Sequence, residues 1–256
     1  MSTLMLKDTL PGFFTELQKI ASKDYGDRVG TSATAGTAGL VGAGVATGFG
    51  NSLLAKNLQN DITNSSMTTS RATGEELRKI LSPKTQLDLV PNRDLGSLMY
   101  IPKDLPHTTP GHSLGGTARS SSVMGPQFAA HELGHGRLWN KSDRLRKVLM
   151  GSRALAPLAT LGTTIGAGVA DTDSKFSKAM PLAGLAATAP VLADEAYASL
   201  KGYGALKRIG SKPAVLRTAR RQLGKAFGTY GLGIAAPAML APYLTRKIKE
   251  RLQKKS

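Results

Sequence analysis

Residues 131 to 135 read His131-Glu132-Leu133-Gly134-His135, and no other stretch of the sequence says as much about the chemistry that the fold must accommodate. On an α-helix, two histidines four positions apart lie on one face about one turn apart, so both imidazoles can reach one metal ion. A glutamate beside the first histidine can act as general base on a water molecule that the metal activates. The stretch predicts a helix that carries two zinc ligands, His131 and His135, with Glu132 as the catalytic base.

The alternative to a metal site is a solvated helix on which the two histidines and the glutamate simply face water. The residues around the motif favour burial, because residues 128–130 are Phe-Ala-Ala, Leu138 and Trp139 follow, and Pro126 stands near the expected helix start. Three polar groups on a buried helix need hydrogen-bond partners or a metal ion. The flanking residues therefore favour the metal site.

Composition restricts the remaining ligands. The chain has 256 residues, no cysteine and four histidines, so neither disulfides nor a thiolate zinc site is available. A third zinc ligand must be an Asp, a Glu, or one of the other two histidines, His107 and His112. Both histidines fall in a loop over residues 102–126 that is rich in Pro, Gly, Ser and Thr. There they could bind substrate, polarise its carbonyl, or simply be solvated.

Glu195 is the best third ligand among the acidic residues that follow the motif. The other five are Asp143 among basic residues, Asp171 and Asp173 in a polar turn, Asp194 directly before Glu195, and Glu250 in a basic tail. On a helix that begins near Pro190, Glu195 shares a face with Ser199, and Ala198 beside them allows close approach to the motif helix. The expected site holds one Zn²⁺ ion between His131, His135 and Glu195.

Positive charge is concentrated after the motif. The net charge is +17, yet residues 1–136 carry 12 basic and 11 acidic residues, whereas residues 137–256 carry 22 and 6. Uncharged segments at 154–170 and 179–193 lie between basic runs. They predict a hydrophobic hairpin, in lipid or in protein, that returns Glu195 to the motif. The basic runs on both sides indicate a membrane association with the active site facing the cytoplasm.

Two further segments lack charge. Residues 30–55 place Ala35, Gly39, Ala43 and Thr47 in one row of small side chains, which predicts either a membrane-inserted helix or a flexible Gly/Ala loop. Residues 228–244 contain two prolines and predict a buried, re-entrant or interfacial helix.

These features divide the chain into three consecutive segments. Residues 1–56 combine an amphipathic helix after Pro11 with the first uncharged segment, residues 57–205 form the metallopeptidase core with hairpin 154–193, and residues 206–256 form a basic region with segment 228–244. Within the core, a helix is expected from Thr73 or Gly74 to Leu81, and a short strand over residues 98–101. The predicted fold is mainly α, with a short β edge strand or hairpin and Gly/Ala-rich, membrane-associated helices.

The motifs resemble those of the gluzincin peptidases of the CAAX prenyl protease and HtpX type. His131, Glu132, Gly134 and His135 match that family's H-E-x-G-H, and Glu195 with Ala198 matches its second motif, E-x-x-A. The resemblance covers roughly residues 95–205 and implies a compact, divergent zinc endopeptidase that acts on polypeptides. The strand over residues 98–101 would correspond to the family's substrate-binding edge, whereas Ser199 stands where the family usually has an Asp.

Several residues could serve substrate binding or stabilise the oxyanion: Tyr100, His107, His112 and Tyr197. The main alternative function is a non-enzymatic protein, membrane-binding or a structural component of a virion, in which H-E-x-x-H is vestigial. Nucleic acid is a less favoured partner, because aromatic residues are scarce among the basic residues 201–225 and no recognised module is present.

Overall fold

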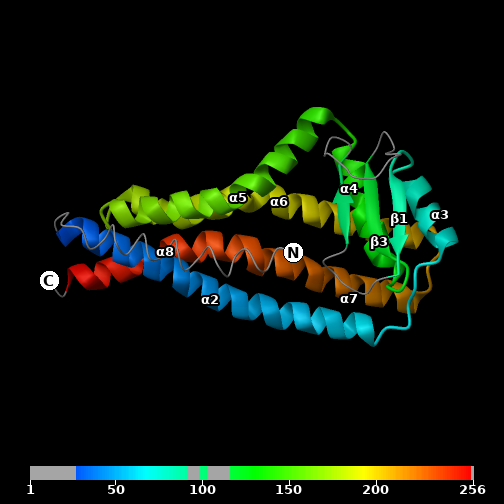
Figure 1. Ribbon diagram of the computed structural model, residues 1–256, viewed down its shortest axis with the longest axis horizontal. Coiled ribbons are helices and arrows are strands. Elements are labelled where there is room, and N and C mark those ends of the chain that lie inside the picture. Colours follow the sequence, from blue (N-terminus) through cyan, green and yellow to red (C-terminus); the bar gives the residue numbers. More distant parts are fainter. Residues whose placement is uncertain (1–26, 92–97, 103–115, 255–256) are drawn as a thin grey trace. The chain divides into compact units, whose positions relative to one another are not determined.

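The computed structural model describes residues 27–91, 98–102 and 116–254, and the chain is mainly helical (Figure 1). The helices and strands, in chain order, are α2 (Asp27–Thr63), α3 (Arg71–Leu81), β1 (Gln86–Val90), β2 (Met99–Ile101), β3 (Thr117–Ser121), α4 (Pro126–Trp139), α5 (Asp143–Val169), α6 (Lys175–Arg208), α7 (Pro213–Tyr230), a π-helical turn (Gly231–Ala235) and α8 (Ala236–Gln253). This confirms the mainly α prediction.

The chain folds into two compact units, each built from separate stretches of sequence. Unit 1 consists of residues 1–50, 154–189 and 232–256, and unit 2 of residues 51–153 and 190–231. Helices α2, α5 and α6 each contribute residues to both units. The sequence instead predicts three consecutive segments, because composition changes along the chain do not reveal which helices pack together.

Unit 2 contains a three-stranded sheet in the order β1-β3-β2. Strand β1 pairs with β3 in parallel, and β2 pairs with β3 antiparallel, with Tyr100 opposite Ala118. Strand β2 is the strand expected over residues 98–101, and it lies at an edge of the sheet. The central strand β3 is not predicted by the sequence.

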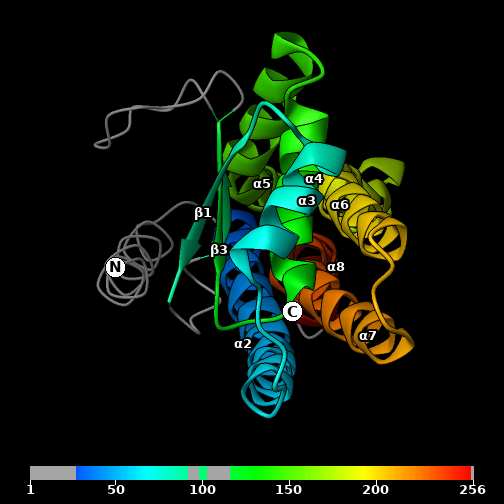
Figure 2. The same ribbon diagram turned by 90° about the vertical axis from the view of Figure 1, so that its right-hand side faces the viewer.

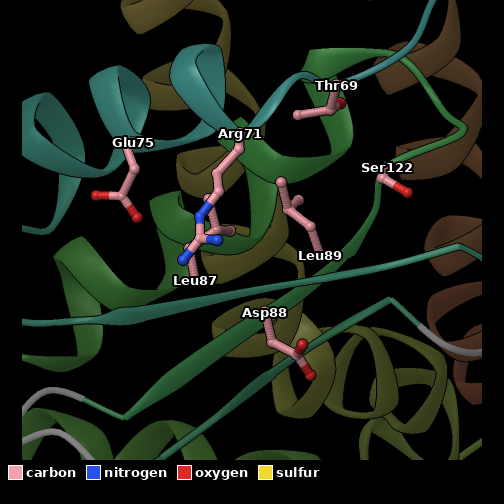
Figure 3. A pocket seen from close by; sticks show the side chains of 7 residues that line it. All are labelled: Thr69, Arg71, Glu75, Leu87, Asp88, Leu89 and Ser122. Carbon is pink, nitrogen blue, oxygen red and sulfur yellow. The ribbon is translucent and has the colours of Figure 1, made fainter.

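Helices α3 and α4 lie side by side next to the sheet (Figure 2). Their shared core includes Leu77 from α3, Leu133 from α4 and Ala118 from β3, all fully buried. Strand β1 alternates its side chains as a half-buried strand should: Leu87 and Leu89 point toward α3, and Asp88 points to the opposite side (Figure 3). There Asp88 accepts a hydrogen bond of 2.9 Å from Arg119.

The ends of α3 and α4 follow local sequence signals. Helix α3 begins after Ser70, whose hydroxyl accepts a hydrogen bond of 3.1 Å from the backbone N–H of Thr73, and it ends at Leu81, just before Pro83. It starts two to three residues earlier than expected because Ser70 is the N-cap. Helix α4 starts at Pro126, as expected. The amphipathic helix expected after Pro11 lies outside the described residues.

The described residues of unit 1 form helices joined by one turn at residues 170–174, and no strand lies among them. It is built from the first part of α2, the second part of α5, the first part of α6, and α8. Residues 30–55 form part of α2 and not a flexible loop. Two helical stretches, Gly30–Thr63 and Lys175–Arg208, are long and apolar enough to cross a membrane.

Candidate metal centre

Helices α4 and α6 bring the three expected zinc ligands together in unit 2. His131 and His135 lie on α4, Glu195 lies on α6, and ligand atoms of all three lie within 4.8 Å of one another. Their exposed fractions are 8%, 4% and 1%, respectively. The predicted ligand set is therefore a real cluster, and it is buried.

The distances between the three ligand atoms are those of a zinc site. Nε2 of His131 lies 3.2 Å from Nε2 of His135, and Oε2 of Glu195 lies 3.3 Å and 3.5 Å from these two nitrogens. Tetrahedral zinc with bonds of about 2.0–2.1 Å places its ligand atoms about 3.3–3.4 Å apart. The buried Oε2 atom of Glu195 also has no hydrogen-bond partner among the described residues. A cation bound to all three atoms would satisfy it.

Two glycines allow the helices to approach closely enough for this geometry. A Cβ atom on Gly134 would lie 2.6 Å from the carbonyl oxygen of Ala198, and one on Gly202 would lie 2.8 Å from the carbonyl carbon of Ala130. Real side chains do not fit at such distances, so the backbones of α4 and α6 are in direct contact. Ala198 lies in this contact, as its position beside Glu195 predicts.

The second ring nitrogen of each histidine is held by a side chain of α6. Nδ1 of His135 lies 3.1 Å from Oδ1 of Asp194, and Nδ1 of His131 lies 3.1 Å from Oγ of Ser199. An Nδ1–H donor in each bond leaves Nε2 unprotonated and directed at the metal position. Ser199 therefore holds the ring of His131, at the position where the gluzincin peptidases that the motifs resemble usually have an Asp.

Arg153 and Trp139 complete the surroundings of the ligands. The guanidinium of Arg153 donates to Asp194 at 2.7 Å and also to Oε1 of Glu195. Trp139 donates from its indole N–H to both carboxylate oxygens of Asp194 at 3.0 Å. Because Oε1 of Glu195 is occupied by Arg153, only Oε2 remains for a metal ion.

Three carboxylates lie in or beside the cluster of the two histidines and Glu195. Glu132, Asp194 and Glu195 carry three negative charges when ionised, and Arg153 offsets one. Burial raises the pKa of Glu132, although the nearby histidines oppose the shift. Burial alone would lower the pKa of His135, but its hydrogen bond to Asp194 and the negative charges of Glu195 and Asp194 outweigh burial and raise that pKa to about 10. Without a metal ion, the site therefore retains protons that a divalent cation could replace.

Other residues predicted for substrate or oxyanion binding do not join this cluster among the described side chains. The ring of Tyr197 packs against the ammonium groups of Lys141 and Lys201, each 5.4 Å from its centroid. Tyr100 lies on β2 and its side chain is outside the described part, as are His107 and His112.

The structure adds residues that the sequence interpretation did not assign to the site: Asp194, Arg153, Trp139 and Tyr230. Tyr230, at the end of α7, forms a hydrogen bond with Arg153; burial, followed by the charges of Glu195 and Glu132, raises its pKa. The sequence does indicate Asp194 and Arg153, because each is a charged residue at the end of an uncharged helical segment. Nothing in the sequence around Tyr230 indicates that it belongs to the site.

A separate hollow in unit 2 lies between the start of α3 and strand β1 (Figure 3), and none of the zinc ligands lines it. It is lined by Arg71 and Glu75 of α3 and by residues 87–89 of β1, of which Leu87 and Leu89 point toward α3. The site that carries distinctive chemistry is therefore the cluster between α4 and α6. Comparisons of the chain with protein-family models, curated proteins and solved structures find no match.

Proposed function

We propose that the protein is a zinc-dependent endopeptidase whose metal ion is held by His131, His135 and Glu195. One observation carries the proposal. The three ligand atoms form a buried triangle with sides of 3.2, 3.3 and 3.5 Å, and its carboxylate corner lacks a hydrogen-bond partner among the described residues. Three protein ligands leave a fourth tetrahedral position for water or substrate, which is the arrangement of catalytic zinc sites.

Bound zinc would polarise the scissile carbonyl and increase the acidity of a water molecule. Glu132 accepts the proton of the attacking water and returns it to the leaving amine. Burial raises the pKa of Glu132 above the usual range for a glutamate, which favours proton uptake by this carboxylate. Asp194 and Ser199 keep the two histidine rings oriented during these steps.

An extended polypeptide could bind beside β2. This strand pairs with β3 along one edge, and none of the described residues pairs with its other edge. Helix α4, which carries Glu132, packs against both β2 and β3. Addition of a substrate strand to such an edge is a common way to bind peptides without strong sequence preference.

Metal analysis of the purified full-length protein tests the zinc site. We expect about one zinc ion per chain in the wild type and in Glu76→Ala, a control on the exposed face of α3, but loss of zinc in Glu195→Ala. A wild-type protein that takes up no zinc when dialysed against it would overturn the site.

Glu132→Gln tests the enzymatic step separately. The variant should retain zinc, since Glu132 is not a ligand, but should no longer cleave unfolded casein or a peptide library. A zinc-loaded wild type that cleaves neither substrate would instead support the non-enzymatic alternative, a membrane-binding or virion structural protein with a vestigial motif.

The finer proposal on location is that the protein is membrane-associated and that the zinc site faces the cytoplasm. Its support is the charge pattern. Basic residues are concentrated in 137–153 and 201–225, whereas residues 171–178, at and just after the turn between α5 and α6, contain two acidic residues and two lysines. Protease treatment of intact and opened cells distinguishes the two sides. Cleavage within 137–153 in intact cells, or a soluble protein found only in particles, would contradict it.

A further inference from the structure

Unit 1 has an interior of small side chains. Within its described residues, the buried positions are Ala, Gly, Thr and Ser together with Pro242 and Lys249, and only Lys249 is larger than threonine. The row Ala35, Gly39, Ala43 and Thr47 on α2 is buried at every position. The buried positions on the other helices are Ala156, Thr164, Ala167, Gly168, Ser177, Gly184, Thr188, Ala235, Ala238, Ala241 and Thr245.

The large apolar side chains of unit 1 lie on its outside. Val45 and Phe49 on α2 are each 68% exposed, Leu158 and Val169 on α5 are 61% and 68% exposed, and Leu182 on α6 is 67% exposed. By contrast, every buried Val, Leu, Ile, Met, Phe or Trp among the described residues belongs to unit 2. Unit 2 thus follows the rule for proteins in water, and unit 1 reverses it.

The helices of unit 1 meet through glycines. A Cβ atom on Gly39 would lie 2.8 Å from the carbonyl oxygen of Ala241, and one on Gly184 would lie 2.9 Å from the carbonyl carbon of Ala238. Helix α8 is therefore in backbone contact with both α2 and α6. Close backbone contact through small residues is how helices associate where no hydrophobic effect drives them together, as in lipid.

Three buried threonines of these helices bond to their own helix. Thr47 donates to the carbonyl of Ala43 at 2.7 Å, Thr164 to that of Thr160 at 2.7 Å, and Thr188 to that of Leu185 at 2.8 Å. These bonds need no water, so these three threonines are compatible with a hydrocarbon environment. The buried hydroxyls of Ser177 and Thr245 have no hydrogen-bond partner among the described residues.

Each of the four helices has an uncharged stretch within unit 1, and charged residues of the unit such as Lys175, Lys178 and those at 246–251 lie outside these stretches. Residues 30–50, 154–170, 179–189 and 232–245 contain no Asp, Glu, Lys or Arg. The uncharged part of α2 spans about 30 Å at 1.5 Å per residue, which matches the hydrocarbon thickness of a bilayer.

From these observations we infer that unit 1 is a four-helix bundle embedded in the hydrocarbon core of a phospholipid bilayer, with its Val, Leu, Ile and Phe side chains against the lipid chains. The inference includes α8, for which the sequence favours a buried, re-entrant or interfacial helix. It stands independently of the proposed peptidase activity, because none of its residues belongs to the zinc site.

The helix directions within unit 1 suit such a bundle. Gly42 lies near Leu244 and Gly50 near Leu232, so α2 and α8 run antiparallel. Helices α5 and α6 form an antiparallel hairpin through a short turn, and Gly168 near the end of α5 contacts Ser32 near the start of α2. The four points at which the chain leaves or re-enters the bundle, near residues 50, 154, 189 and 232, therefore lie at one end of it.

Single-cysteine labelling tests the inference directly, because the natural chain has no cysteine. Val45→Cys and Leu158→Cys would be compared with Asp173→Cys, whose parent side chain is 99% exposed in the turn between α5 and α6. The full-length variants are reconstituted into phosphatidylcholine vesicles that contain phosphatidylglycerol, opened so that both faces are accessible, and treated with a charged maleimide.

The expected result is fast labelling of Asp173→Cys and almost none of Val45→Cys and Leu158→Cys. A bimane probe attached in detergent at the latter two positions should be quenched by nitroxide groups on the lipid chains. Equal labelling at all three positions would overturn the inference. Protection of Val45→Cys in a lipid-free soluble oligomer would also overturn it, because a second copy of the chain would then cover the apolar surface.

A pair of glycine variants keeps the test valid if a cysteine variant folds poorly. Gly44 is exposed on α2, and a Cβ atom there would meet nothing within 4 Å. We expect Gly44→Leu to insert and fold in the vesicles as the wild type does, whereas Gly39→Leu should lose the bundle. Aggregation of Gly44→Leu in lipid, with an intact Gly39→Leu, would contradict the assignment of inner and outer faces.

Discussion

Asp194 receives three hydrogen-bond donors at the edge of the candidate zinc site, from His135, Trp139 and Arg153. All three donors depend on a full carboxylate, since both oxygens are used. Replacement by asparagine puts an N–H₂ group against at least one of these donors. The ring of His135 then loses the acceptor that fixes its tautomer.

Asp194→Asn should therefore weaken zinc binding by about 10–100-fold while leaving the protein folded. Competition with a chromophoric chelator measures the affinity, and the visible spectrum of the Co²⁺-loaded protein reports the ligand geometry without relying on activity. Asp173→Asn, in an exposed turn, serves as the matched control. Equal zinc affinity and an unchanged Co²⁺ spectrum in Asp194→Asn would show that this carboxylate does not orient His135.

The ligands of the candidate site could be predicted from the sequence, whereas their supporting residues could not. His131, Glu132 and His135 share one short motif, and the helix face that Glu195 shares with Ser199 beside Ala198 indicates the third ligand. The sequence gives Asp194 no role of its own, because it stands directly before the better candidate. The structure shows that both residues are used: Glu195 faces the metal position, and Asp194 reaches the end of α4, where His135 and Trp139 lie.

The contact between α4 and α6 is the element on which the site depends. Because the backbones touch at Gly134 and Gly202, the helices cannot separate without moving Glu195 away from the histidines. A methyl group at Gly134 would have to displace the backbone of Ala198, since it would lie 2.8 Å from its Cα atom.

Gly134→Ala should cost about 1–3 kcal/mol of folding stability through this overpacking and should reduce zinc affinity as well. Gly204→Ala provides the control on α6, because a Cβ atom there meets nothing within 4 Å, and it should stabilise the helix by up to about 1 kcal/mol. Denaturant unfolding and zinc titration on both variants check the expectation. If Gly134→Ala were as stable as Gly204→Ala, the close contact would not exist.

Of the three strands, the sequence predicts β2 but neither β1 nor β3, and for β3 the reason lies in its residue types. Strand β3 reads Thr-Ala-Arg-Ser-Ser, which lacks the branched and aromatic residues typical of strands, yet four of its five residues are buried. It is central in the sheet and packs against α4, where small side chains allow close approach. Strand β2, with its Met-Tyr-Ile sequence, was predictable because its residues fit the usual preferences.

The two units differ in the size of their buried side chains, which are small in unit 1 and include large apolar residues in unit 2. The sequence shows this difference only in part. The row of small residues on α2 and the uncharged segments indicate which residues belong to a tightly packed bundle of small side chains. Which segments join which unit depends on long-range contacts, such as those of Gly39 with Ala241 and of Gln127 with Gln222, that no local pattern encodes.

Because the three candidate zinc ligands belong to unit 2, metal binding there should stabilise that unit alone. Zinc at 100 times its dissociation constant adds about 2.7 kcal/mol, and for a unit of this size that corresponds to a rise in midpoint of about 5–10 °C. The chain's single tryptophan, Trp139, lies in unit 2 beside Asp194, so its fluorescence follows the unfolding of that unit. Circular dichroism follows the helices of both units.

In detergent solution, a chelator should therefore lower the unfolding temperature of unit 2 measured by Trp139 fluorescence. The circular dichroism signal that remains above this temperature comes from unit 1, and its melting temperature should not change. Glu195→Ala should unfold at the same temperature with and without the chelator, because it has lost a ligand. A chelator-dependent shift of equal size in Glu195→Ala would mean that the metal acts elsewhere in the chain. A shift of the whole helical signal would mean that the two units unfold as one.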